Sequence, residues 1–384
     1  MFRPTSNRLA FTARTSFYQL WRRTLAPSFV ALRPITARQE FLLHSSAKAP
    51  LQQPQVSIPT HATEEATYVE TTKSAPKEPQ EDTDTDYNFV VAAAWHPKNR
   101  GRKSKDTAEK TPYWKRTQVG KVDAGEDAFF HTNTRNGLAV GVADGVGGWA
   151  EVGVDPALFS WTLMNNCASI AKDLESVNAH DILDNAFTEL VDRRMVQAGS
   201  STACILEMCK KTGYMTSCNL GDSAFILIRD QKIVFESPSQ QHFFNCPYQL
   251  TVVPDNYPNR ASYVTDLPKD GDRKSFFLRN GDLIILATDG YFDNVFSNET
   301  LQIVNAHMGQ IVDTGNSEGS LAHVRVLAKL LTDAARRLSL DPKRLSPWAK
   351  GARAHGGHYR GGKVDDITCI VTLVQQKHLP EEMD

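Results

Sequence analysis

The chain contains the stretch Leu138-Ala139-Val140-Gly141-Val142-Ala143-Asp144-Gly145, and a second stretch, Leu283-Ile284-Ile285-Leu286-Ala287-Thr288-Asp289-Gly290, repeats its pattern. In both, an apolar strand runs directly into Asp-Gly. A buried strand holds the carboxylate at its end rigidly, and the glycine lets the backbone approach whatever the carboxylate binds. If the two strand ends meet at one site, their acidic oxygens favour a hard divalent cation, magnesium or manganese.

Two further acidic pairs lie at strand ends. Glu126-Asp127 opens an apolar strand, and Asp365-Asp366 precedes the apolar run that begins at Ile367. A single Asp-Gly is foremost a turn dipeptide, but carboxylates placed repeatedly at strand ends would repel one another unless a cation lay between them. The histidines show no H-E-x-x-H or similar ligand spacing, so a zinc site is disfavoured.

Apolar periodicity and turn signals predict the secondary structure. Besides the two strands quoted above, we expect strands at residues 87–95, 127–132, 203–208, 214–220, 224–228 and 367–374, and helices at 156–170, 180–195, 299–307 and 321–338. Tight hairpin turns such as Asn136-Gly137 make neighbouring strands antiparallel. Helices on antiparallel sheets give an α+β fold class, and the proline-containing residues 235–274 are expected to form a long surface excursion near the site.

Composition divides the chain into a targeting segment, a linker and one large domain. Residues 1–45 combine many arginines with hydroxyl and bulky apolar residues and have no acid before Glu40, which is typical of a mitochondrial transit peptide. A disordered basic tail is the alternative interpretation of the same arginines. Residues 46–86 are rich in Pro, Gln, Thr, Ser and Glu and predict a disordered linker, so the folded domain is expected at 87–378, followed by a tail at 379–384.

Other global features exclude several classes of protein. The net charge of −1 gives no overall attraction to nucleic acid or to an anionic membrane. No apolar run reaches the roughly 18 to 20 residues that cross a bilayer, so we expect no transmembrane segment. The 6 cysteines are scattered without a C-x-x-C pair, which indicates core thiols in a reducing compartment.

Six short motifs occur in an order that resembles one known family. They are GEDA at 125–128, ADGVGGW at 143–149, GSSTA at 199–203, NLGDS at 219–223, ATDGYFD at 287–293 and DDIT at 365–368. In this order they resemble the motifs of the metal-dependent type 2C serine/threonine protein phosphatases, over residues 118–374. Residues 153–156 and 240–245, together with the arginine-rich start, resemble the mitochondrial branch of that family.

The resemblance implies two packed antiparallel β-sheets flanked by helices, a four-layer αββα sandwich, with two Mn²⁺ or Mg²⁺ ions at one end. The metal ligands that it implies are Asp144, Gly145, Asp289 and Asp365, while Glu126 acts on one ion largely through water and is supported by Asp127. Asp144 and Asp289 are then catalytic through the water molecule that the ions activate. Such a water attacks phosphorus directly, so no phosphoenzyme is required.

Two positions depart from the pattern of the better-known members. Val146 stands where those members carry the histidine proposed to protonate the leaving alkoxide, so that proton has to come from elsewhere. The phosphate-binding arginine that they carry shortly before the Glu-Asp pair is also missing. Arg116 and Lys121 are the candidate substitutes.

The implied function is hydrolysis of phosphoserine and phosphothreonine in phosphorylated proteins of the mitochondrial matrix. The branch suggests metabolic enzymes as substrates, including those of coenzyme Q synthesis.

One alternative is a pseudophosphatase that binds phosphoproteins without turnover, for which Val146 is the only support. Another is a two-metal hydrolase of nucleic acid or small phosphate esters. It would need a basic groove interleaved with aromatics, which the folded region does not indicate, so no nucleic-acid partner is expected. The sequence indicates no particular oligomeric state.

Overall fold

Two five-stranded antiparallel sheets pack face to face in the computed structural model, which describes residues 86–98, 122–173, 178–255, 257, 260–312 and 317–377. The first sheet contains, in spatial order, β1 (Asp86–His96), β14 (Ile367–Lys377), β13 (Leu283–Ala287), β7 (Ala224–Arg229) and β8 (Lys232–Glu236). The second contains β12 (Asp272–Phe277), β6 (Tyr214–Leu220), β5 (Ala203–Cys209), β3 (Gly137–Asp144) and β2 (Asp127–Asn133). The strand pairs within both sheets are antiparallel, as the hairpin turns predict.

Strand β13 shows why its sequence is apolar throughout. Leu283, Ile285 and Ala287 lie in a hydrophobic cluster with residues of the C-terminal helices, whereas Ile284 and Leu286 lie in the cluster between the sheets. Successive side chains of a strand point to opposite faces. The first sheet therefore buries both faces, and alternation with polar residues is not needed.

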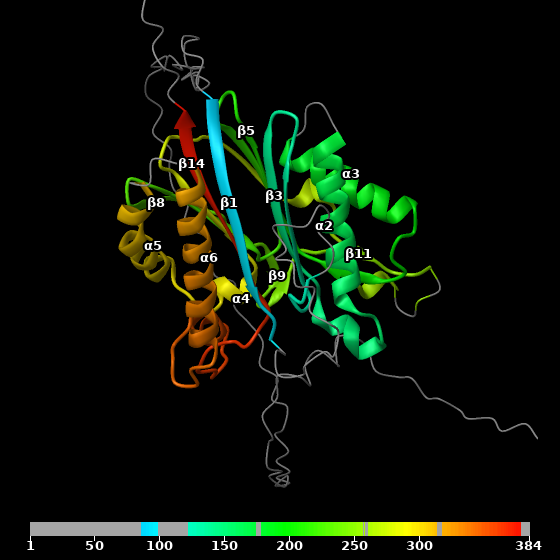
Figure 1. Ribbon diagram of the computed structural model, residues 1–384. Helices are drawn as coiled ribbons and strands as arrows, with labels where there is room; N and C mark the ends of the chain where they lie inside the picture. The colour runs from blue at the N-terminus through cyan, green and yellow to red at the C-terminus, as the bar shows by residue number, and fades with distance from the viewer. Residues whose placement is uncertain are drawn as a thin grey trace, which may run out of the picture. The chain divides into compact units, whose positions relative to one another are not determined.

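Helices cover the outer face of each sheet (Figure 1). Helices α2 (Pro156–Asp173) and α3 (Ala179–Asp192) pack on the second sheet, and α6 (Ser317–Ser339), flanked by α5 (Ser297–Val312), packs on the first. Helix α2 begins as expected, because Asp155 Oδ1 accepts a hydrogen bond from Ala157 N–H at 3.0 Å and Pro156 occupies the first helical position. The four-layer αββα sandwich is confirmed.

Several short elements near the strand ends were not predicted. They are β4 (Gly199–Ser201), β9 (Gln241–Phe243), β10 (Cys246–Pro247), β11 (Leu250–Val252), α4 (Asp289–Phe292), α7 (Pro347–Ala354) and the 3₁₀ turns η2 (Gly147–Val152), η3 (Arg260–Ser262) and η4 (Pro268–Asp270). The edge strands β8 and β12 of the two sheets were not predicted either. Elements of two to eight residues carry too few positions for a periodic signal. The expected surface excursion thus contains a hairpin, β9–β10, and a strand, β11, that pairs with β4.

The remaining predictions divide by where they fall in the chain. All six cysteines are free, and all but Cys209 are buried, which agrees with core thiols. No helix within the described ranges is both long enough and apolar enough to cross a membrane. The transit peptide at 1–45, the linker at 46–86 apart from Asp86, and the tail at 379–384 lie outside the described residues.

Candidate active site

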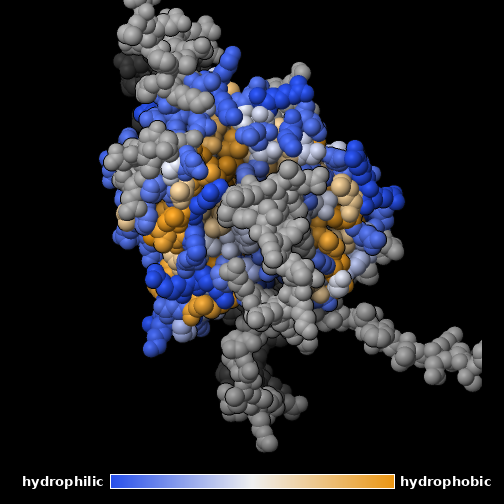
Figure 2. All heavy atoms as spheres, viewed as in Figure 1, coloured by the Kyte–Doolittle hydropathy of each residue, from blue (hydrophilic) through white to orange (hydrophobic). Residues whose placement is uncertain are grey.

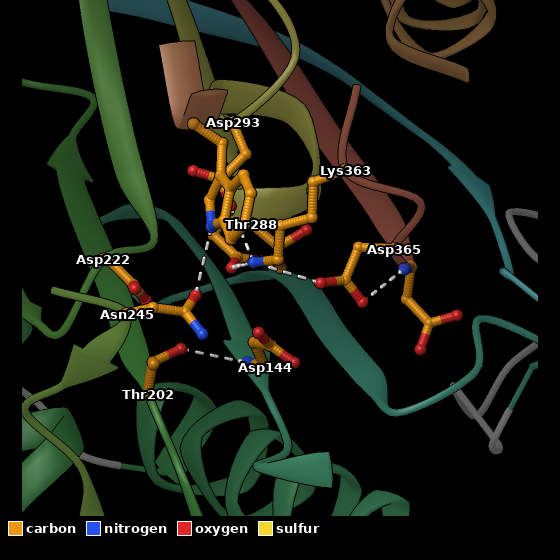
Figure 3. Close-up of polar contacts among 12 residues, drawn as sticks. Asp144, Thr202, Asp222, Asn245, Thr288, Asp293, Lys363 and Asp365 are labelled. Atoms are coloured by element: carbon orange, nitrogen blue, oxygen red, sulfur yellow. Dashed lines mark hydrogen bonds and ion pairs between the residues drawn. The ribbon is translucent and has the colours of Figure 1, made fainter. Parts of the chain in front are cut away.

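Acidic strand ends from both sheets meet at one end of the sandwich (Figure 3). Asp127, the first residue of β2, lies opposite Asp144, the last residue of β3. Asp289 begins α4 directly after β13, and Asp365 lies two residues before β14. Asp144 interacts electrostatically with Asp127, Asp289 and Asp365. The structure therefore brings together four acids that are far apart in the sequence.

Asp127 connects the two sheets at this end. Its Oδ2 accepts hydrogen bonds from Thr288 Oγ1 at 2.9 Å and from Thr368 Oγ1 at 2.7 Å, and the residue is only 1% exposed. Asp127 belongs to the second sheet, whereas the two threonines lie at the end of β13 and in β14 of the first. The three side chains thus fix the relative position of the strand ends that carry the acids.

The side chain of Asp366 accepts hydrogen bonds from backbone N–H groups. Its Oδ1 accepts from Lys98 N–H at 2.7 Å and its Oδ2 accepts from Glu126 N–H at 2.9 Å, so it joins the end of β1 to the start of β2. A Cβ at Gly290 would lie 1.8 Å from the carbonyl oxygen of Asp366, and this close approach explains the glycine after Asp289. Of the pair Asp365-Asp366, the second residue is therefore structural.

Two motifs of the second sheet hold Asp144 in place. Its N–H donates to Thr202 Oγ1 at 3.0 Å, and its carbonyl oxygen accepts from Ser201 Oγ at 2.8 Å and from Thr202 N–H at 3.0 Å. Thr202 Oγ1 lies 2.9 Å from the hydroxyl of Ser223, which belongs to the motif at 219–223. At Gly145 a Cβ would lie 2.6 Å from the carbonyl oxygen of Pro156 and 2.9 Å from that of Glu126, so no side chain fits there. These contacts support the framework role expected for the GSSTA and NLGDS motifs.

Two lysines lie among the carboxylates, and sequence reasoning identified neither. Lys363 Nζ is 2.5 Å from Asp289 Oδ2, 2.7 Å from Asp293 Oδ2 and 3.2 Å from Asp365 Oδ2. Lys98 Nζ is 2.7 Å from Glu126 Oε2, 3.3 Å from Asp365 Oδ1 and 3.5 Å from Asp366 Oδ2. Each ammonium group therefore neutralises three acids in part. The position of Lys363, two residues before Asp365, could have indicated that it lies at the site. Lys98 begins a basic stretch of sequence, and nothing there indicates a place among the acids.

Crowding shifts the pKa values of these acids. Burial, followed by the charges of Asp289 and Asp127, raises the pKa of Asp144 well above its usual range. Burial raises the pKa of Asp293 to about 7, although the charge of Lys363 opposes this. For Asp365, burial acts in the same upward direction, but Lys363 and Lys98 outweigh it and lower the pKa. Among the described residues, the acids therefore outnumber the lysines that could stabilise them in ionised form.

The charge balance and the donor atoms fit divalent cations. Among the described residues, the cluster contains two ammonium groups, those of Lys98 and Lys363, and eight carboxyl groups, those of Glu126, Asp127, Asp144, Asp222, Asp289, Asp293, Asp365 and Asp366. Asp289 Oδ1 is buried without a hydrogen-bond partner among the described residues. Carboxylate oxygens are the ligands that magnesium and manganese prefer.

The side chains are not yet arranged as a metal site. Within the described ranges, no three His, Cys, Asp or Glu side chains form a group that could hold an ion. The ammonium group of Lys363 lies between Asp289, Asp293 and Asp365 (Figure 3). Cation binding would have to draw Asp289 and Asp365 away from this lysine.

The other predicted residues fall outside this cluster or outside the described ranges. The phosphate-binding candidates Arg116 and Lys121 are not among the described residues. Asp222, expected only as framework, faces the cluster: Asp289 and Lys363 act on its charge, and its buried Oδ1 has no hydrogen-bond partner in the described part of the chain. Val146 donates its N–H to Ser200 O at 3.0 Å and offers no side-chain proton.

Comparisons with known proteins agree with this geometry. No protein-family profile matches the chain. The PTC7 protein phosphatase homologue of Homo sapiens is 38% identical over 254 residues, which cover 66% of this chain and 80% of that protein. The azr1 5-azacytidine resistance protein of Schizosaccharomyces pombe is 39% identical over 265 residues, covering 67% of this chain and 84% of that protein.

A solved structure supports the same assignment. The photosystem II phosphatase PBCP superposes with a TM-score of 0.57 at 28% identity, covering 74% of this chain and 98% of that one. The chain belongs to the type 2C family of protein phosphatases. Its activity is that of a protein serine/threonine phosphatase.

In this type 2C phosphatase, the hydrogen bonds through which Asp127 connects the two sheets should contribute to the free energy of unfolding. We expect Thr368→Val to lower the free energy of unfolding by roughly 1–3 kcal/mol, because buried Asp127 loses one of its two hydroxyl donors. Urea unfolding in the presence of chelator, followed by tryptophan fluorescence, measures the difference. Thr372→Val is the matched control, since Thr372 is also buried in β14 but its hydroxyl bonds to none of the described residues. Equal losses in both variants would contradict the role of this bond.

Proposed function

We propose that this phosphatase hydrolyses phosphoserine and phosphothreonine with the help of two divalent cations, Mn²⁺ or Mg²⁺, bound at the acidic strand ends. The observation that carries the proposal is that, among the described residues, eight carboxyl groups and two ammonium groups lie where four strand ends meet. A phosphoryl group would be repelled by this charge alone. Additional positive charge is needed before an anionic substrate can approach.

The residues that would hold the cations are Asp144, Asp289 and Asp365 through carboxylate oxygens and Gly145 through its carbonyl oxygen, with Glu126 acting through water. When bound, such cations supply a nucleophilic water and offset the charge of the phosphoryl group. The protein's own contribution is positional. Ser201 and Thr202 fix the backbone of Asp144, and the backbone of Gly290 contacts that of Asp366.

The pseudophosphatase alternative receives little support from the site. Asp144, Asp289 and Asp365 all lie together, so none of the implied carboxylate ligands is missing. Val146 only shows that the proton for the leaving group is not supplied at position 146.

The first test is removal of a ligand. Asp144→Asn should lower turnover of a phosphothreonine peptide in Mn²⁺ by roughly a hundredfold or more, since even residues that only orient a metal ligand contribute 10- to 100-fold. Chelator should abolish the activity of the unaltered protein. Exposed Asp184→Asn, on α3, is the control and should retain full activity. Turnover that persists in chelator would overturn the metal-dependent mechanism.

The second test uses Lys363, which the cations would have to displace. Lys363→Met should lower the free energy of unfolding of the metal-free protein by roughly 1–3 kcal/mol, because three carboxylates lose their shared counter-cation. The same variant should bind Mn²⁺ about tenfold more tightly, because no ion pair has to break first. Isothermal titration with Mn²⁺ and urea unfolding in chelator measure both effects without relying on turnover.

Lys211→Met is the matched control for Lys363→Met. Lys211 is exposed in the turn between β5 and β6, and it forms no ion pair with the described residues. Its substitution should change neither Mn²⁺ affinity nor stability. Mn²⁺ affinity that is unchanged in Lys363→Met would show that the cations bind without displacing this lysine.

We also infer that the protein acts in the mitochondrial matrix, with metabolic enzymes such as those of coenzyme Q synthesis among its substrates. The arginine-rich, acid-free start supports the location. Residues 1–45 fused to a fluorescent protein should direct it into mitochondria, and the same fusion with its arginines replaced by glutamine should remain in the cytosol. A cytosolic location of the unaltered fusion would contradict the inference.

A further inference from the structure

Residues 342–364 form an acid-free basic segment beside the active site. They contain no Asp or Glu, and their cationic residues are Lys343, Arg344, Lys350, Arg353, Arg360 and Lys363, with His355 and His358 between them. The segment includes α7 and the loop that leads to β14. We call it the basic rim.

The basic rim is attached to the acidic centre at both ends. Near its start, Trp348 N–H donates to the carbonyl oxygen of Asp293 at 3.1 Å, and Trp348 Nε1 donates to Asn245 Oδ1 at 3.3 Å. At its end, Lys363 forms ion pairs with Asp289 and Asp293. In Figure 1 the rim is the orange loop below α6, at the same end of the sandwich as α4. A substrate bound at the centre would therefore pass close to it.

Internal contacts make the rim a defined structure. Ser346 Oγ accepts from Ala349 N–H at 3.1 Å, which caps α7, and donates to Gly361 O at 2.8 Å, which closes the loop. The rings of Trp348 and Tyr359 meet edge to face with centroids 4.2 Å apart. The cations are thus presented from a rigid scaffold.

Only part of the positive charge is used internally. Arg344 pairs with Glu299, and Lys363 pairs with the acidic centre. The side chains of Lys343, Lys350, Arg353 and Arg360 are exposed and form no ion pair with any described residue. Where this loop lies, at the lower left of the view, Figure 2 shows hydrophilic residues together with a smaller hydrophobic patch.

Two arginines of the rim are oriented for binding. Arg353 Nε donates to the carbonyl oxygen of Tyr359 at 3.1 Å, and Arg360 Nε donates to that of Lys343 at 2.9 Å. These bonds fix each guanidinium group, while the structure shows no contact of the terminal Nη groups with the described residues. A fixed guanidinium with free Nη groups is suited to bidentate binding of a carboxylate or a phosphate.

We propose that Lys350, Arg353 and Arg360 bind acidic or phosphorylated side chains of the protein substrate, next to the phosphoresidue that is hydrolysed. The proposal rests on the phosphatase activity of the chain and names the class of sequence that the site prefers. An anionic membrane fits less well, because α7 buries Trp348, Ala349 and Ala352 and has no apolar face left to enter a bilayer. A single-stranded nucleic acid would need aromatic rings free to stack on bases, whereas Trp348 is buried and Tyr359, although 38% exposed, packs against Trp348 and donates its hydroxyl to Gly362 O at 2.8 Å.

Binding of two labelled phosphoserine peptides to the full chain tests the proposal. One peptide has Asp and Glu on both sides of the phosphoserine, and the other has Asn and Gln at those positions. In Mn²⁺, with the phosphoserine of both peptides replaced by a phosphonate that cannot be hydrolysed, fluorescence anisotropy should show tighter binding of the acidic peptide. Arg353→Gln combined with Arg360→Gln should weaken that binding roughly tenfold, since two exposed ion pairs are lost, and should leave the neutral peptide unchanged. With Mn²⁺, hydrolysis of p-nitrophenyl phosphate should not change.

Two further variants separate charge from loop structure. Lys350→Gln breaks none of the hydrogen bonds that hold the loop, so it should weaken binding of the acidic peptide without any effect on folding. The matched control replaces Lys211 and Arg279 with glutamine. These exposed cations lie at the opposite ends of the strands that lead to the site, where Leu278 N–H donates to Gly213 O at 2.8 Å. The control should bind both peptides as the unaltered chain does.

Three outcomes would overturn the proposal. Equal affinity of the unaltered chain for the two peptides is one, and equal losses for both peptides and for p-nitrophenyl phosphate is another. The third concerns the double variant Arg353→Gln and Arg360→Gln. If it bound both peptides as before but no longer bound phosphatidylcholine vesicles that contain phosphatidylserine, the rim would be a membrane surface. A chain that binds the acidic peptide but hydrolyses neither substrate in Mn²⁺ would refute the phosphatase activity and leave the docking surface supported.

Discussion

A buried carboxylate shared by the two sheets determines the geometry of the active site. Asp127 accepts hydrogen bonds from Thr288 and Thr368, and so joins the second sheet to the first at the end where the acids gather. A cluster of buried apolar side chains also lies between the sheets, and apolar contacts have little directional preference. Hydrogen bonds to a buried carboxyl group are directional and costly to break, so they define one arrangement of the strand ends. Because Thr288 adjoins Asp289 and Asp127 lies opposite Asp144, any slip of one sheet against the other would separate the acids.

The price of this arrangement is electrostatic repulsion. Burial and mutual charge raise the pKa of Asp144, and the free Oδ1 of Asp289 remains without a hydrogen-bond partner in the described part of the chain. Lys98 and Lys363 offset part of the charge and hold the acids near one another. Their ammonium groups lie at distances from carboxylate oxygens that suit ion pairs, so part of the acidic charge is offset without metal. The remaining excess of acid makes the site receptive to more strongly charged cations.

The α+β class and the acids at the strand ends could be predicted from local patterns, whereas the four-layer sandwich was predicted from the resemblance of six motifs to a known family. Apolar runs ending in Asp-Gly, the hairpin at Asn136-Gly137 and the Asp155-Pro156 helix start each carry their own signal. The roles of Lys363 and Asp366 could not be predicted, since they arise from contacts between segments far apart in the chain. Short elements such as β4 and α7 were missed because their stability comes from neighbours rather than from periodicity. The basic rim was missed for a related reason: its cations are dispersed along the segment and become one surface only when the loop closes on Gly361.

The acidic centre needs positive charge directed inward, whereas substrate binding at the basic rim needs positive charge directed outward. Residues 342–364 supply both. A phosphoprotein approaching from solution meets a field that is screened over about 10 Å, so charges close to the entrance matter most. The ammonium groups of Lys98 and Lys363 are paired with carboxylates and attract an approaching phosphoprotein only weakly. The exposed side chains of Arg353 and Arg360 have no such partner among the described residues and attract it more strongly. Lys363 at the end of the same segment contributes its charge inward instead. The inward and the outward cations therefore lie on one loop, which Ser346 closes through its hydrogen bond to Gly361 O, so their positions relative to each other are set by the same contacts.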